Sequence, residues 1–184
     1  MPEAKRKSLE FWRRKVGEEQ AEQIKEEAIA RGQKIHQLLE NYAHDKETQC
    51  LPELTPFYRQ ALATVKSFKK IFCTEEFLYH PQLQYAGTTN LIADVEDIPT
   101  IIDYKTSSKA KKPSYMEDAK IQGTAYALAC QACKQIYIPQ VLILVIHPHG
   151  TQEFWVKEEQ REEYVEKWLE RLESYLAQPV PIYG

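Results

Sequence analysis

The sequence is poor in glycine, has no long hydrophobic run and carries little excess charge of either sign. Only 6 of its 184 residues are glycine, while 43% are hydrophobic and 28% are charged, which is the composition of an ordinary globular domain. The longest apolar run, Val141 to Ile146, is far shorter than the roughly 20 residues needed to span a bilayer. The net charge of −3 argues against a protein that coats nucleic acid nonspecifically.

The start of the sequence also lacks an apolar segment. Met1 is followed by a polar stretch that contains Lys5, Arg6 and Lys7, so we expect an intracellular protein with no membrane partner. Four cysteines are present, and in that compartment they are expected to be reduced thiols. They are Cys50, Cys73, Cys130 and Cys133.

Positive charge is concentrated in two segments, although the whole chain is slightly negative. The first, between Lys5 and Lys15, is either a solvated surface or a contact for nucleic acid. The second follows residue 105 and contains Lys109, Lys111 and Lys112. Because phosphate binding depends on local rather than total charge, we expect the second segment to contact a phosphate backbone.

Hydrophobic periodicity predicts helices and strands in an order typical of one α/β domain. Helical patterns cover residues 8–16, 18–42, 56–70, 115–134 and 158–177, and strand patterns cover 75–80, 85–95, 100–106, 141–147 and 151–156. We expect a single domain over residues 1–184, with a helical part at 1–72 and a sheet core at 73–184 covered by helices on both faces. Gly32 predicts either a break in the second helix or a close approach of another segment.

A carboxylate and a lysine, Asp103 and Lys105, end the second strand of a predicted hairpin. Side chains alternate along a strand, so both lie on the same face. Phosphodiester hydrolysis needs a nucleophilic water, neutralised phosphate charge and help for the leaving oxygen, and divalent metals held by carboxylates supply all three. Asp103 and the carbonyl of Tyr104 are candidate oxygen ligands. Lys105 is a candidate for orienting the attacking water and meeting the developing charge.

Further motif residues occur in a fixed order around this element. In chain order they are Arg31, His36, Glu40, Glu75, Gln122 and Tyr126. Gln122 and Tyr126 are four residues apart and therefore share one helix face. Together with Asp103-Tyr104-Lys105, these segments resemble the motifs of the PD-(D/E)XK nuclease superfamily. The resemblance is greatest to its RecB-type exonuclease branch, which includes phage exonucleases and the mitochondrial genome maintenance exonuclease.

The resemblance implies a restriction-endonuclease-like core, with a central mixed sheet flanked by helices and an N-terminal helical roof over the site. One or two Mg²⁺ or Mn²⁺ ions would be held by His36, the residue at position 90, Asp103 and the Tyr104 carbonyl. Lys105, Asp103 and Gln122 would act in catalysis, with Gln122 supporting the lysine. Glu75, Glu40 and Tyr126 would support the site.

The resemblance also bears on DNA and on the cysteines. Residues expected to contact DNA are Arg31, Lys109, Lys111, Lys112 and Tyr115. Some relatives carry an iron–sulfur cluster on four cysteines. The pair Cys130 and Cys133 is followed by no further cysteine, and the other two lie far upstream, so we do not expect a cluster here.

Position 90 departs from the pattern, because Asn90 stands thirteen residues before Asp103, where the resemblance calls for a metal-binding aspartate. The change is either an engineered Asp→Asn substitution, which we favour, or natural degeneracy. Asp94 is a poor substitute, because four residues along a strand place it about 13 Å away.

The function implied is a DNA exonuclease of the cytoplasm of a bacterial or phage-infected cell. It would act on single-stranded ends, leave 5′-phosphate and 3′-hydroxyl groups, and work alone or with recombination or repair proteins. The present chain would be an inactive form. The alternatives are a nuclease-fold module that binds without cutting, and a duplex endonuclease of the same superfamily.

Overall fold

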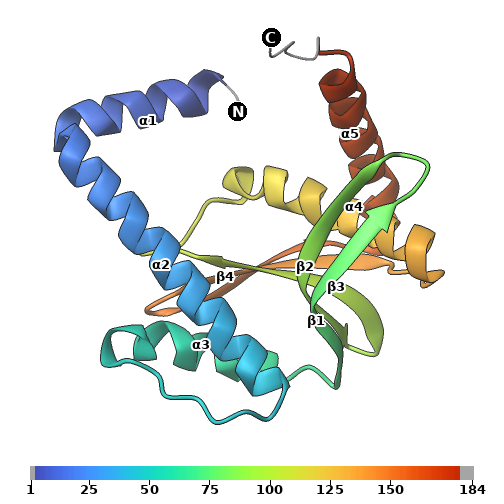
Figure 1. Ribbon diagram of the computed structural model, residues 1–184, viewed down its shortest axis with the longest axis horizontal. Coiled ribbons are helices and arrows are strands. Elements are labelled where there is room, and N and C mark those ends of the chain that lie inside the picture. Colours follow the sequence, from blue (N-terminus) through green and yellow to red (C-terminus); the bar gives the residue numbers. More distant parts are fainter. Residues whose placement is uncertain (1–2, 179–184) are drawn as a thin grey trace, which may run out of the picture.

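Five strands form one mixed sheet within residues 3–178, the part of the chain that the computed structural model describes (Figure 1). The strands are β1 (Lys70–His80), β2 (Tyr85–Val95), β3 (Ile98–Thr106), β4 (Gln140–His147) and β5 (Gly150–Val156), in that spatial order. Neighbours are antiparallel except β3 and β4, which are parallel. The helix α4 (Glu117–Lys134) connects these two strands, as parallel neighbours require. The predicted central mixed sheet is confirmed.

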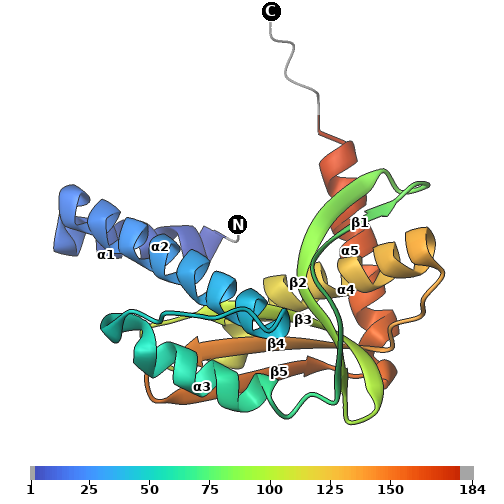
Figure 2. The same cartoon turned by 60° about the horizontal axis from the view of Figure 1, so that its bottom comes forward.

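Helices cover both faces of this sheet, as the sequence predicts. The helices α1 (Glu3–Val16), α2 (Glu18–Ala43) and α3 (Thr55–Val65) precede it, and α5 (Glu158–Leu176) ends the fold. Residues of α2 and α3 belong to one apolar cluster, and residues of α4 and α5 belong to another. Figures 1 and 2 show α2 and α3 on one side of the sheet and α4 on the other. Short 3-10 turns occupy Pro52–Leu54 and Pro113–Tyr115.

The strand β4 lies at the centre of the hydrophobic core. Leu142 and Leu144 belong to the cluster beneath α2 and α3, whereas Val141 and Ile143 belong to the cluster beneath α4. All four are buried. The continuous apolar sequence of this strand therefore reflects burial on both faces, as predicted.

The hairpin of β2 and β3 opens at its far end. A two-residue turn, Glu96 and Asp97, has φ values of 55° and 66°, the left-handed conformation that matches the twist of a hairpin. From this turn the strands pair only as far as Leu91 and Ile102. Beyond Leu91, β2 pairs with β1 alone, down to His80 and Tyr85. The ribbon of β1 and β2 thus bends out of the sheet (Figure 2), and a gap in backbone pairing begins at residue 90.

Of the two alternatives predicted for Gly32, the close approach is found and the break is not. The helix α2 continues through Gly32, because Ile35 and Leu39 beyond it are buried and outweigh a helix cost of about 1 kcal/mol for glycine, and a β carbon there would lie 3.5 Å from Oγ1 of Thr106.

Other predicted element boundaries were wrong. The helix α3 ends at Val65, and β1 begins at Lys70, five residues earlier than predicted, because the added segment pairs with β2. The helix α4 begins at Glu117, after a 3-10 turn.

Gly123 allows α4 to lie directly on β4, and this contact gives a stability prediction. A β carbon at Gly123 would lie 2.3 Å from Cγ1 of Val141, which no real packing allows. We expect Gly123→Ala to lower the free energy of unfolding by about 1–3 kcal/mol, despite the better helix propensity of alanine. Chemical denaturation measures the change.

A second substitution checks the cause. Val141→Ala in the Gly123→Ala background should recover part of the loss, because it removes the clashing methyl groups. Gly150→Ala is the matched control, since its β carbon would lie an ordinary 3.6 Å from His147. A loss of the same size in the control would contradict the packing explanation.

Candidate active site

The candidate site lies where β2 separates from β3, and the side chain of Asn90 occupies the gap. Its Oδ1 accepts a hydrogen bond of 2.9 Å from the backbone N–H of Tyr104, replacing the missing pairing between the strands. Its Nδ2 donates to Oε1 of Glu75 at 3.1 Å and lies 3.4 Å from Nδ1 of His36. Asn90 thus links α2, β1 and β3 at one point.

Glu75 reaches Asn90 from the neighbouring strand in a strained backbone conformation. The pairs Thr74–Leu91 and Glu76–Thr89 place Glu75 opposite Asn90. Its φ of 45° is unfavourable for a residue with a side chain. Strain of this kind persists where surrounding structure fixes it and is concentrated at functional sites. Glu75, predicted to support the site, therefore lies in direct contact with position 90.

His36 reaches the site from α2 in a defined tautomer. Its Nε2 lies 3.1 Å from the carbonyl oxygen of Tyr104. A carbonyl can only accept, so Nε2 carries the hydrogen and Nδ1 presents its lone pair to Asn90. Burial lowers the pKa of His36, and the negative charge of Asp103 opposes this only in part. The imidazole is therefore neutral, the form that ligates metals.

Asp103 is a buried carboxylate with an unsatisfied oxygen. Only 6% of the residue is exposed, and burial raises its pKa against the opposing effect of Lys105. The ammonium of Lys105 lies 2.7 Å from Oδ2, but at an angle that leaves this oxygen without a hydrogen bond. The Lys105 side chain is 40% exposed, so one end of the ion pair is solvated. An anionic oxygen of this kind is suited to a cation.

Gln122 and Tyr126 contact each other on α4. Nε2 of Gln122 donates to the Tyr126 hydroxyl at 2.7 Å, as their spacing predicts. Gly87 of β2 makes room for this tyrosine, because a β carbon there would lie 2.6 Å from its ring. Burial raises the pKa of Tyr126, and the charges of Asp103 and Lys105 act on it in opposite directions. The N–H of the Gln122 amide therefore goes to Tyr126, and its carbonyl oxygen is the group that can accept from a lysine ammonium.

Two predicted residues of α2 have other neighbours. The guanidinium of Arg31 lies over the ring of Phe57, 5.2 Å from its centroid, and its buried Nε has no hydrogen-bond partner. Glu40 accepts a hydrogen bond from Gln37 on its own helix at 3.1 Å. Neither contact joins these residues to Asn90.

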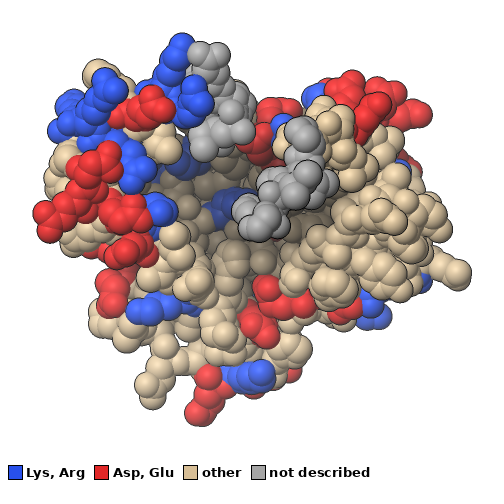
Figure 3. Space-filling model, turned by 45° about the horizontal axis from the view of Figure 1, so that its top comes forward, with Lys and Arg blue, Asp and Glu red and all other residues tan. Residues whose placement is uncertain are grey.

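The predicted DNA-contacting residues lie on exposed surface after β3. Lys109, Lys112 and Tyr115 are exposed, and Lys111 is half-buried. Gln152 of β5 holds the backbone of Lys111 through two hydrogen bonds, of 2.6 and 3.2 Å. Figure 3 shows further lysine and arginine side chains gathered at the end of the molecule formed by α1 and α2, beside a hollow in the surface.

The ligand set for a divalent cation is incomplete in one position. Asp103 supplies a buried carboxylate oxygen that is ion-paired with Lys105, and His36 directs a nitrogen lone pair toward position 90. Asn90, however, presents an N–H donor where a ligand oxygen is needed. Within residues 3–178, no three histidine, cysteine, aspartate or glutamate side chains converge closely enough to hold a metal ion. The residues present fit a cation except at position 90.

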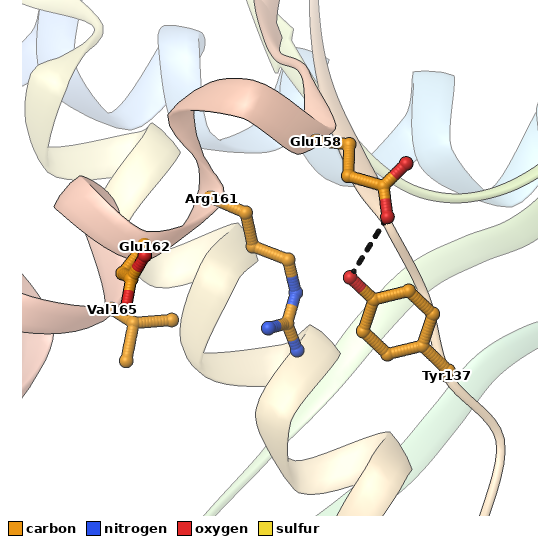
Figure 4. A pocket seen from close by; sticks show the side chains of 5 residues that line it. All are labelled: Tyr137, Glu158, Arg161, Glu162 and Val165. Atoms are coloured by element: carbon orange, nitrogen blue, oxygen red, sulfur yellow. Dashed lines mark hydrogen bonds between the residues drawn. The ribbon is translucent and has the colours of Figure 1, made fainter.

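The cysteines and a separate surface hollow stand apart from this site. Cys50 packs on the cluster beneath α2 and α3, whereas Cys73, Cys130 and Cys133 belong to the cluster on the other face of the sheet. The hollow, of about 310 Å³, is lined by Tyr137, Glu158, Arg161, Glu162 and Val165 (Figure 4). There Tyr137 donates to Glu158, and Arg161 lies over the Tyr137 ring, so these polar groups satisfy one another.

The link between Asn90 and Glu75 could have been found from the sequence. A turn at residues 81–84 pairs His80 with Tyr85, and counting back five residues on each strand gives Glu75 and Asn90. The left-handed backbone conformation at Glu75 could not have been predicted from the sequence, because glutamate does not favour that conformation.

Comparison with known proteins gives two matches. The family model of the PD-(D/E)XK nuclease superfamily matches residues 7–180. Mitochondrial genome maintenance exonuclease 1 of Mus musculus is 25% identical over 189 aligned positions, which cover 95% of this chain and 55% of the mouse protein. The chain thus spans about half the length of that relative. Among the described residues, no helix has the length and apolarity to cross a membrane. The family match covers nearly the whole chain, including every motif residue named above, and the chain belongs to the PD-(D/E)XK nuclease superfamily.

Proposed function

We propose that this fold is that of a RecB-type exonuclease that degrades DNA from single-stranded ends, leaving 5′-phosphates and 3′-hydroxyls. We also propose that Asn90 prevents cleavage in this chain. The observation that carries the proposal is the meeting of His36, Glu75 and the Tyr104 backbone at the Asn90 side chain. Asp103 and Lys105, on either side of Tyr104 at the end of β3, form an ion pair beside it. The groups that would ligate a cation thus surround the Asn90 amide, which cannot replace an aspartate as a ligand.

Enzymes of this superfamily generally use divalent metals. For this chain we propose Mg²⁺ or Mn²⁺. Such an ion would neutralise phosphate charge and lower the pKa of water. Asp103 and His36 would hold it, together with an aspartate at position 90. The Tyr104 carbonyl, which accepts the hydrogen of His36 Nε2 in the present chain, would become a ligand only on giving up that hydrogen bond. The imidazole makes Mn²⁺ effective beside Mg²⁺.

The other predicted residues would orient the water, support Lys105 or bind the DNA backbone. The Lys105 ammonium, half in solvent, would orient the nucleophilic water and stabilise the charge that develops on the phosphate. Gln122 and Tyr126 would support it from α4. Lys109, Lys111 and Lys112 would hold the DNA backbone, which makes binding steeply dependent on salt. Arg31 and Tyr115 would extend this contact.

A second function, binding without cutting, is favoured by one observation. Asn90 uses its carbonyl oxygen and its amide group within the site, so position 90 has its hydrogen bonds without a metal. A protein in this state would hold DNA at the same surface and leave it intact.

Linear and circular substrates test whether the activity requires ends. We expect the Asn90→Asp variant to degrade linear single-stranded DNA in Mg²⁺ or Mn²⁺ and to leave single-stranded circles and blunt duplex intact. Denaturing gels with end-labelled and body-labelled DNA measure the products. Cleavage of circles at a comparable rate would identify an endonuclease instead. Loss of all cleavage in the Asn90→Asp, Lys105→Ala double variant is the control against contamination.

A further inference from the structure

Two aromatic rings on β1 lie exposed directly beyond the candidate site. Phe77 and Tyr79 are 62% and 48% exposed. Their ring centroids are 6.4 Å apart, and the ring planes differ by only 28°. Exposed apolar side chains that occur singly are ordinary, but two parallel rings on alternate residues of one strand form a surface. We call Phe77 and Tyr79 the aromatic pair.

The opposite side of the same ribbon is firmly braced. Leu78, between the two rings, is fully buried against the cluster of α4. The Tyr85 hydroxyl donates to the backbone of Ala125 in α4 at 2.9 Å, and its ring meets Trp168 of α5 edge-on at 4.9 Å. Successive side chains alternate between faces, so the aromatic pair points away from α4. The strand that carries the aromatic pair is therefore held in place by its packing against α4 and α5.

Nothing on the neighbouring strand covers the rings. The residues paired with Phe77 and Tyr79 are Thr88 and Ala86, which are small and exposed. The strand β1 is the edge of the sheet, so no further strand lies beside it within the described residues. Figures 1 and 2 show α4 and α5 on one side of the ribbon and α1 and α2 on the other. The ring faces are thus accessible from the side of the site that carries the basic helix α1.

The aromatic pair continues the line of the candidate site. Glu75, Phe77 and Tyr79 are alternate residues of β1, so the rings lie about 7 and 13 Å along the strand from Glu75. A single strand that enters the site would pass over them with unpaired bases. Unpaired bases stack on aromatic side chains whatever their sequence. A basic surface for phosphates beside rings for bases is the combination that single-strand binding requires.

We propose that Phe77 and Tyr79 form a base-stacking platform that holds the single strand as it enters the site. The inference rests on the proposed function, since it takes the strand's phosphates to the position of Asn90. Bases would contact the rings, and phosphates would contact Lys109, Lys111 and Lys112. The platform would favour single strands, because paired bases cannot present their faces. A protein partner on this surface would show no dependence on bases.

Oligonucleotides with and without bases test the platform on this chain, with no metal present and therefore no cleavage. Fluorescence anisotropy compares binding of oligo(dT) with that of an abasic strand of equal length. The intact protein should bind oligo(dT) more tightly. Phe77→Ala and Tyr79→Ala should each weaken oligo(dT) binding by about 5- to 100-fold and leave abasic binding unchanged. Phe72→Ala is the matched control, because that ring lies on the same strand with 45% exposure and no ring among residues 3–178 is stacked on it.

Phe77→Trp and Tyr79→Trp should restore the preference for bases, and their fluorescence should be quenched by oligo(dT) and not by the abasic strand. These variants also guard against a folding defect in the alanine forms. Equal binding of the two strands by the intact protein, or equal losses on both strands in the alanine variants, would overturn the platform and leave the nuclease proposal standing. Absence of binding to either strand, with an Asn90→Asp variant that does not cut, would overturn both.

Discussion

Asn90→Asp should convert this chain into an active nuclease, with DNA cleavage in Mn²⁺ rising by at least about 100-fold. Residues that only orient a metal ligand already contribute about 10- to 100-fold in affinity or activity, and position 90 would supply a ligand itself. The aspartate can keep the bond that Oδ1 accepts from Tyr104. Its second oxygen would take the place of Nδ2, close to Glu75 and to the Nδ1 lone pair of His36. Initial rates on end-labelled single strands measure the gain.

The same substitution should make the stability of the protein depend on metal. Without a cation, carboxylates at 90 and 75 would face each other at about the distance of the present hydrogen bond, and like charges repel. The variant should therefore melt below the original chain in EDTA. Added Mn²⁺ should recover it, by about 2.7 kcal/mol at 100 times the dissociation constant. The original chain should respond much less. If the melting temperature of the variant does not change with Mn²⁺ and the variant does not cut DNA, position 90 is not a metal-ligand position.

The arrangement of the sheet was predictable because its signals are local. The turn after Val95, predicted over residues 96–99 and found at Glu96 and Asp97, and the continuous apolar run of β4 are each signals within a few residues. The start of β1 was missed for the opposite reason. Residues 70–74 carry no clear strand alternation, and their pairing with β2 is a contact between distant segments.

The sequence predicts which residues lie near one another at the candidate site, but not which hydrogen bonds and ring contacts they make. His36, Asp103 and Lys105 follow from motif spacing, and the structure brings them to the same strand ends. That Gln122 bonds to Tyr126, or that Arg31 lies over Phe57, depends on packing between elements. The spacing of residues along the chain contains no information about it. The same limit applies to the aromatic pair, whose exposure depends on the bend of the β1–β2 ribbon.

The buried charge of Asp103 gives a prediction in which stability and activity change in opposite directions. Burial raises its pKa despite the nearby ammonium of Lys105, so the ionised form is less stable in the folded protein than in the unfolded chain. Asp103→Asn removes this charge with little change of shape, and Lys105, at 40% exposure, remains solvated. We expect the variant to be more stable at pH 7, on the order of 1 kcal/mol, the free energy that corresponds to one pKa unit, or about 2–4 °C in melting temperature. Asp94→Asn, in the same hairpin and half-exposed, should change stability by less than about 0.5 kcal/mol.

The pH dependence identifies the cause of this gain. A carboxyl group whose folded pKa is raised favours folding at acid pH, and that contribution is lost as the pH rises through the folded pKa. The advantage of Asp103→Asn should therefore be full at neutral pH and shrink as the pH falls toward the unfolded carboxyl value of about 3.9. In the Asn90→Asp background the same change should abolish cleavage, because it removes the oxygen suited to the metal. Greater stability together with lost activity would show that the buried charge is kept for function at a cost to the fold, whereas a destabilised Asp103→Asn would show that the ion pair holds the strand in place.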